Sequence, residues 1–182
     1  MESKQKRDEF KLRIAGIGLG NHRFSIACDK AFFEIAGITE LEDGFLELDI
    51  EMEKKENMLS ISFHFDGQVT APCDRCLDPV TLPLAFDEHL VVNLIPMGEN
   101  ETDGDEIWVL NENEYEIDLF HFVYESIRLA LPMQITHSIT EDGTSACNPE
   151  IVKQLDQLSQ KEGLDPEDTD PRWDALKNIK LD

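Results

Sequence analysis

The chain has 182 residues, 41% of them hydrophobic and 30% charged, so it can form one sizeable domain with its own core. No apolar run is long enough to cross a bilayer, and residues 1–13 lack the apolar segment of a secretion signal, so we expect a cytoplasmic protein with no membrane contact. The net charge is −23, and residues 38–120 alone carry 22 acidic and 3 basic residues. Such a segment would be repelled by a phosphate backbone, which favours a basic partner unless the acids serve only solubility.

The N-terminal segment, residues 1–13, is interpreted as a basic tail that precedes a single domain over residues 14–162. A solubilising role competes here with that of an arm that contacts RNA. The candidate RNA-contacting cations are Lys4, Lys6, Arg7, Lys11 and Arg13. Residues 10–14 alternate apolar and polar side chains, which is typical of a strand. The glycines that follow, at 16, 18 and 20, are interpreted as a loop, because no helix follows as a dinucleotide site would require.

Three alternating segments follow an ambiguous stretch at residues 24–37. Residues 45–52 and 58–69 place apolar side chains at every second position, and the polar turn 54–57 joins them into an antiparallel hairpin. The third segment, residues 80–95, extends the sheet. The acidic side chains of these strands then lie together on the outward face.

The second half of the chain changes to helical periodicity. After an acidic loop at 98–106, which lacks the spacing of a calcium loop, short strands are predicted at 107–110 and 114–117. A helix is predicted from the N-cap Asp118 to Leu131, where Pro132 ends it. A second helix covers 149–161, and residues 163–182 form a linker and a short helix at 171–178.

These elements predict an α+β fold. We expect a twisted antiparallel sheet or a small barrel, covered by the helix at 118–131. The helices 149–161 and 171–178 are placed at the periphery.

The cysteines give the main candidate site. Cys73 and Cys76 lie in a turn between two strands, where a Cys-x-x-Cys can direct both sulfurs at one zinc ion. His137 and Cys147 share the long segment between the two helices and would complete a structural Cys₃His zinc site. Alternatively, the turn holds no metal and the other two residues have structural roles.

No catalytic residues are assigned. The remaining histidines are scattered, and His121 makes an ordinary helix contact with Glu125. The carboxylates are too numerous to select a catalytic pair, and no phosphate-binding loop is present. A metal-dependent enzyme at the cysteine cluster remains the alternative, and it would need an open coordination position.

Several motifs resemble those of the YceD family, the large ribosomal RNA subunit accumulation proteins. They are Cys-Asp-Arg-Cys-Leu-Asp-Pro-Val at 73–80, the preceding Gly-Gln-Val at 67–69, the helix end Ser-Ile-Arg-Leu-Ala-Leu-Pro at 126–132, and Asp-Pro-Arg-Trp-Asp-Ala-Leu at 170–176. Many relatives carry further cysteines after the position of Pro132, where this chain has only His137 and Cys147.

This resemblance implies a non-enzymatic accessory role in the accumulation of large-subunit ribosomal RNA. The family's gene often neighbours that of a small basic ribosomal protein, which agrees with the acidic composition. We therefore expect a ribosomal protein or a large-subunit assembly intermediate as partner, with any contact to RNA indirect. The terminal segment Asp170, Pro171, Arg172 and Trp173 is a candidate for partner binding. The alternative is direct RNA binding through the N-terminal arm.

Overall fold

The computed structural model describes residues 2–95, 108–111, 114–139 and 145–161. The chain divides into two compact units, residues 1–136 and 137–182, and each is described by itself. The predicted acidic loop at 98–106 lies outside the described residues. So do the linker and terminal helix at 163–182, with the candidate segment Asp170, Pro171, Arg172 and Trp173.

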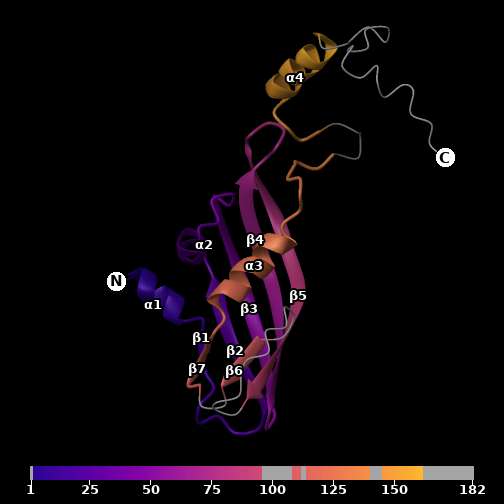
Figure 1. Ribbon diagram of the computed structural model, residues 1–182. Coiled ribbons are helices and arrows are strands. Elements are labelled where there is room, and N and C mark those ends of the chain that lie inside the picture. Colours follow the sequence, from indigo (N-terminus) through magenta and orange to yellow (C-terminus); the bar gives the residue numbers. More distant parts are fainter. Residues whose placement is uncertain (1, 96–107, 112–113, 140–144, 162–182) are drawn as a thin grey trace, which may run out of the picture. The chain divides into compact units, whose positions relative to one another are not determined.

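The first unit is built on a five-stranded sheet, and the predicted α+β class is confirmed (Figure 1). The strands are β2 (Gly20–Cys28), β3 (Asp43–Lys54), β4 (Met58–Pro72), β5 (Pro79–Ile95) and β6 (Trp108–Asn111), in the order β2-β3-β4-β5-β6. The first four pair antiparallel, whereas β6 pairs with β5 in parallel. The sheet is therefore mixed, and it is open because β2 and β6 form its two edges. This corrects the expectation of a wholly antiparallel sheet or a barrel.

The hairpin of β3 and β4 follows the alternation of the sequence. Its register pairs Leu48 with Phe65 and Ile50 with Phe63, so the apolar side chains of both strands share one face. We call this the inner face, and these four side chains are at most 1% exposed. Gly67 lies against the backbone of β3, where an added Cβ would come within 2.1 Å of the carbonyl oxygen of Phe45. A larger residue would push the two strands apart.

Helix α3 (Phe120–Ala130) packs on the inner face. The rings of Phe63 and Phe122 lie 4.7 Å apart, and Val123 and Ile127 are fully buried. The predicted cap Asp118 accepts a hydrogen bond from the Phe120 N–H at 3.0 Å, although the N-cap position itself is one residue later. The outer face of the sheet thereby stays uncovered by this helix.

The ambiguous stretch after residue 24 forms the rest of β2 and helix α2 (Lys30–Ala36). Asp29 caps α2 by accepting a hydrogen bond from the N–H of Phe32, and Gly37 ends the helix in the left-handed conformation. Phe32 and Phe33 are buried in the core. Periodicity could not assign this helix, because it is only two turns long.

The expected N-terminal tail is part of the folded unit. Residues 2–13 form helix α1 (Glu2–Asp8) and strand β1 (Lys11–Arg13), and β1 pairs with β7 (Glu116–Asp118). Phe10 and Leu12 belong to the core, where the Phe10 ring packs against Phe32 and Phe120. The apolar side chains within the basic stretch account for this difference from the expected boundary at residue 14.

The second unit contributes helix α4 (Pro149–Lys161), as predicted. The side chain of Asn148 accepts a hydrogen bond from the N–H of Glu150 at 3.1 Å, and Pro149 takes the first helical position. Leu155 and Leu158 are exposed. Within the described residues, no helix is long and apolar enough to span a membrane.

Candidate metal centre

The turn between β4 and β5 holds Cys73 and Cys76. The two strands remain paired up to Pro72 and Pro79, and the turn then closes through two backbone bonds. The Cys73 N–H donates to the carbonyl oxygen of Asp78, and the Leu77 N–H donates to that of Cys73, each at 2.9 Å. Both cysteines are buried, at 0% and 4% exposure.

Leu77 has an unusual backbone conformation for its residue type. Its φ of 64° lies in the left-handed region, which glycine adopts far more readily than leucine does, and its side chain is 75% exposed. The chain therefore reverses directly after the second cysteine. This reversal keeps Cys73 and Cys76 on the same side of the turn.

The segment that follows α3 is attached to this turn. The Asp74 N–H donates to the carbonyl oxygen of Ile135 at 2.7 Å, and the Ile135 N–H donates to the Asp74 carboxylate at 2.6 Å. These reciprocal bonds fix the backbone just before His137. No sequence pattern predicted these two bonds.

A short bridge places His137 opposite Cys147. Ile139 pairs with Ser145 in an antiparallel bridge, and the Ala146 N–H donates to the carbonyl oxygen of Ser138 at 3.1 Å. Continued by two residues on each strand, this register sets His137 across from Cys147. The Cys147 N–H also donates to the hydroxyl of Ser145 at 3.2 Å. The second pair of candidate ligands is thus assembled locally, as the first is.

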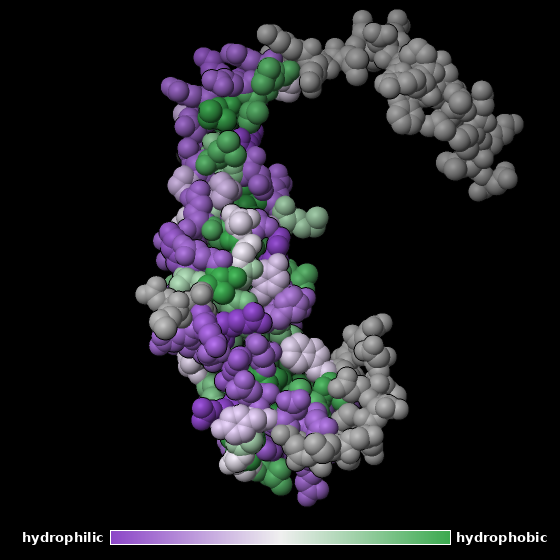
Figure 2. Space-filling model, turned by 60° about the vertical axis from the view of Figure 1, so that its left-hand side comes forward, coloured by the Kyte–Doolittle hydropathy of each residue, from purple (hydrophilic) through white to green (hydrophobic). Residues whose placement is uncertain are grey.

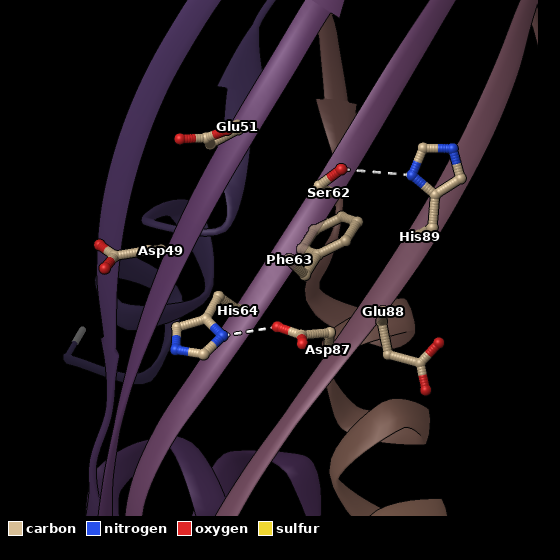
Figure 3. A pocket seen from close by; sticks show the side chains of 8 residues that line it. All are labelled: Asp49, Glu51, Ser62, Phe63, His64, Asp87, Glu88 and His89. Atoms are coloured by element: carbon tan, nitrogen blue, oxygen red, sulfur yellow. Dashed lines mark hydrogen bonds and ion pairs between the residues drawn. The ribbon is translucent and has the colours of Figure 1, made fainter.

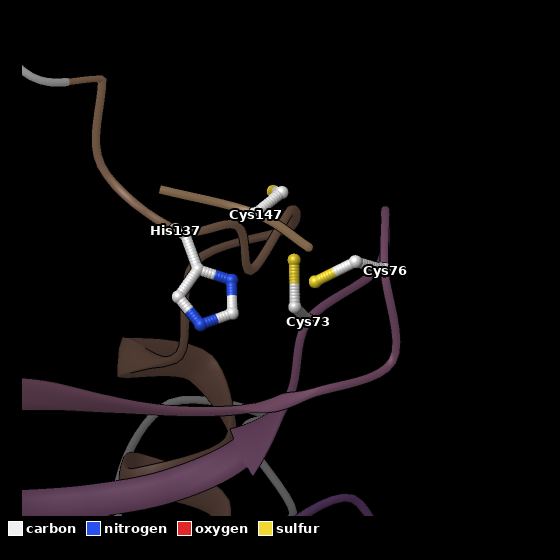
Figure 4. Close-up of side chains that lie close together, drawn as sticks. All are labelled: Cys73, Cys76, His137 and Cys147. Carbon is white, nitrogen blue, oxygen red and sulfur yellow. The ribbon is translucent and has the colours of Figure 1, made fainter. Parts of the chain in front are cut away.

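The structure brings the four predicted ligands together (Figure 4). The three sulfurs and a ring nitrogen all lie within 4.8 Å of one another, and three of the four residues are buried while His137 is half-buried. Within the described residues this is the one group of its kind. The cluster could hold a metal ion.

The donor set fits a tetrahedral ion. Bonds of about 2.3 Å from zinc to sulfur separate neighbouring sulfurs by roughly 3.8 Å, so ligation requires only small movements from the observed spacing. Three sulfurs and one imidazole are ligands that zinc binds in structural sites, and four protein ligands leave no position for a reacting water. This counts against the metal-dependent enzyme considered above.

Cys28 differs from the other three cysteines. It is completely buried in the core, and burial raises the pKa of its thiol to about 12. It therefore stays a protonated, apolar side chain.

Most of the candidate RNA-contacting cations lie beside acidic or aromatic side chains of the same unit. Lys6 lies 3.0 Å from Glu9 and 3.2 Å from Asp29, and Lys11 lies 3.0 Å from Asp8. Arg7 and Arg13 lie over the rings of Phe120 and Tyr115, and Lys4 is exposed. Most of these cations therefore serve the packing of α1 and β1, which weakens the hypothesis of an arm that contacts RNA.

The outer face of the sheet is a second polar region. Its acidic charge was predicted from the sequence, but the arrangement of its side chains was not. Asp49, His64 and Asp87 share one row across three strands, and Glu51, Ser62 and His89 share the next (Figure 3). His64 Nδ1 lies 2.5 Å from an Asp87 carboxylate oxygen, and this hydrogen bond raises the pKa of His64. Hydrophilic side chains also predominate in the view of the surface in Figure 2.

Comparison with protein families identifies a match for most of the chain. A protein-family model described as "Large ribosomal RNA subunit accumulation protein YceD" matches residues 61–180, a range that contains all four candidate ligands. No curated protein and no solved structure shows a significant match.

Proposed function

The chain belongs to the YceD family, and we propose that it acts as an accessory factor, not as an enzyme, in the accumulation of large-subunit ribosomal RNA. In this role it binds a basic ribosomal protein or a large-subunit assembly intermediate. The observation that carries the choice of partner is the charge of −19 over residues 38–120, the segment that contains β3, β4 and β5. Such a surface attracts cationic proteins and repels naked RNA.

We further propose that Cys73, Cys76, His137 and Cys147 hold a structural zinc ion. Zinc would join two pairs of side chains that are far apart in the sequence, Cys73 with Cys76 and His137 with Cys147, and the coordinating thiols would be deprotonated. The support is the proximity of the four ligand atoms. In this role the ion stabilises the fold and takes no part in a reaction.

The function is tested in cells from which the protein is depleted. We expect the amount of large-subunit ribosomal RNA to fall relative to small-subunit RNA, and re-expression to restore it. Capture of the tagged protein at moderate salt should recover large-subunit ribosomal proteins or precursors. An unchanged RNA ratio, or recovery of no ribosomal protein, would remove the proposal.

The metal is tested by elemental analysis of the purified protein. We expect about one zinc per chain in the wild type and loss of that zinc in Cys73→Ser and in Cys147→Ser. Cys28→Ala is the matched control, because it removes a buried thiol outside the cluster and should retain the metal. Full zinc content in Cys147→Ser would exclude the four-ligand site, and wild-type protein without zinc would exclude the ion.

A further inference from the structure

The outer face of β2–β5 carries a line of carboxylates along one strand. Glu47, Asp49, Glu51 and Glu53 occupy alternate positions of β3 and are all exposed. Across the sheet, Glu47 pairs with Asp66, and Asp49 pairs with His64, which in turn pairs with Asp87. We call these six carboxylates and the side chains between them the acidic sheet face.

Few cations of the chain itself neutralise this face. Arg23 lies 2.7 Å from Glu51, and Lys55 lies 3.0 Å from Glu53. Within the described residues, no lysine or arginine lies within 4 Å of the carboxylates of Glu47, Asp49 or Asp66. The carboxylates of Asp66 and Asp49 instead contribute to the raised pKa of His64, which places both in its electrostatic environment.

The pairing of Glu47 with Asp66 works against the stability of the sheet. Two like charges directly opposite each other on neighbouring strands repel, and either position could hold a neutral or basic residue at no cost to the core because both are exposed. Departures from local stability rules are concentrated at functional sites. The repulsion would be relieved by a bound polycation.

The spacing of the carboxylates indicates which conformation of polycation would fit this face. Alternate residues of a strand are about 6.8 Å apart, so the four carboxylates of β3 repeat at that interval, as do alternate side chains of any extended peptide. The face also forms a hollow of about 770 Å³ lined by Asp49, Glu51, Ser62, His64, Asp87 and His89, among others (Figure 3). A strand-like basic segment matches both the repeat and the charge.

We propose that the acidic sheet face binds an extended protein segment with Lys or Arg at alternate positions, laid along β3. The inference rests on the proposed function, because it identifies the surface and the kind of segment by which a basic ribosomal partner would be held. A nucleic acid is disfavoured, since its phosphates would meet the carboxylates. The binding is electrostatic, so it weakens as salt is added.

The test uses two synthetic peptides of equal composition with the full-length protein. One alternates Lys and Ser over about eight residues, which spans the four carboxylates of β3, and the other carries the same lysines in one block. Binding is measured by fluorescence anisotropy at two salt concentrations. We expect the alternating peptide to bind more tightly, and equal affinity for the two peptides would overturn the extended mode of binding.

A pair of triple variants separates the effect of the acidic sheet face on peptide binding from the effect of the net charge. The first, Glu47→Gln/Asp49→Asn/Glu51→Gln, should weaken binding of the alternating peptide by about 10-fold, since three exposed charge pairs are lost. The second, Glu34→Gln/Glu42→Gln/Glu114→Gln, removes the same charge from exposed positions outside the face and should change the affinity by less than about 2-fold. Equal effects of the two would overturn the site.

Further outcomes keep this inference separate from the proposed function. An RNA fragment that binds the wild type and loses binding in the first triple variant would overturn the assignment to a protein segment. The effect of depletion on large-subunit RNA is measured independently of peptide binding. If depletion lowers the amount of that RNA but the peptide does not bind the acidic sheet face, the proposed function stands and the proposed binding surface is refuted.

Discussion

The two faces of the same sheet have opposite physical roles. On β4, Phe63 points inward, is 1% exposed and packs against Phe122, whereas the neighbouring Ser62 and His64 point outward and are exposed. Burial of the inner side chains supplies the favourable free energy of folding. The outer side chains contribute little, and where like charges pair they oppose folding. Stability and the proposed binding are therefore carried by alternate residues of the same strands.

The largest expected effect comes from emptying the inner face. Phe63→Ala should lower the free energy of unfolding by about 3–5 kcal/mol, because a large buried ring is replaced by a cavity. Ser62→Ala, one residue away on the outer face, should change it by less than about 0.5 kcal/mol. Denaturant unfolding measures both, and comparable losses for the two variants would break the distinction between the faces.

Replacement of Lys54, a charged residue on the inner side of β3, should have an intermediate effect on the free energy of unfolding. Lys54 is half-buried, and its ammonium group donates to the carbonyl oxygens of Ile14 at 2.8 Å and of Ile17 at 3.1 Å. Lys54→Met should cost about 1–3 kcal/mol, because both carbonyls lose a charged donor.

Lys55→Met is the matched control for Lys54→Met. Among the residues that the structure describes, the ammonium group of Lys55 makes an exposed ion pair with Glu53 and no other, so the loss should be at most about 1 kcal/mol. A larger loss for Lys55→Met than for Lys54→Met would contradict the assigned role of Lys54.

A smaller effect of opposite sign is expected on the acidic sheet face. Glu47→Gln removes the repulsion with Asp66 and Glu47→Lys replaces it with attraction, so Glu47→Lys should raise the free energy of unfolding by about 0.2–1 kcal/mol. Glu47→Gln should fall between Glu47→Lys and the wild type. The differences should shrink in high salt. A wild type more stable than both variants would show that Glu47 has a structural partner.

The alternation of the sequence was sufficient to predict the hairpin and the division of its side chains between two faces. Period-2 patterns are unambiguous where one face is buried and the other is charged or polar, as they are in β3 and β4. The helix at 149–161 was equally predictable, because Asn148 and Pro149 mark its start. These elements could be predicted because residues close together in the sequence determine where each of them lies.

Other elements depend on contacts that sequence patterns do not contain. The parallel pairing of β6 with β5 and the insertion of Phe10 into the core each join segments distant in the chain. The candidate metal centre lies between these cases. The Cys-x-x-Cys turn is a local signal, but the bridge between Ile139 and Ser145 that brings His137 to Cys147 appears only in the structure.

The smallest expected effect concerns His64, whose pKa is raised chiefly by its hydrogen bond to Asp87. Because the folded-state pKa exceeds the unfolded value of about 6.5, this contact stabilises the protein fully below that pH and is lost as the pH rises through the folded-state pKa. In an NMR titration, Asp87→Asn should therefore lower the midpoint of the His64 ring signals. Glu88→Gln removes the charge of the next residue of β5, which is paired with Phe63 and not with His64. It should shift the His64 midpoint much less. Equal shifts in the two variants would mean that His64 senses the total charge of the sheet and that its contact with Asp87 has no distinct effect.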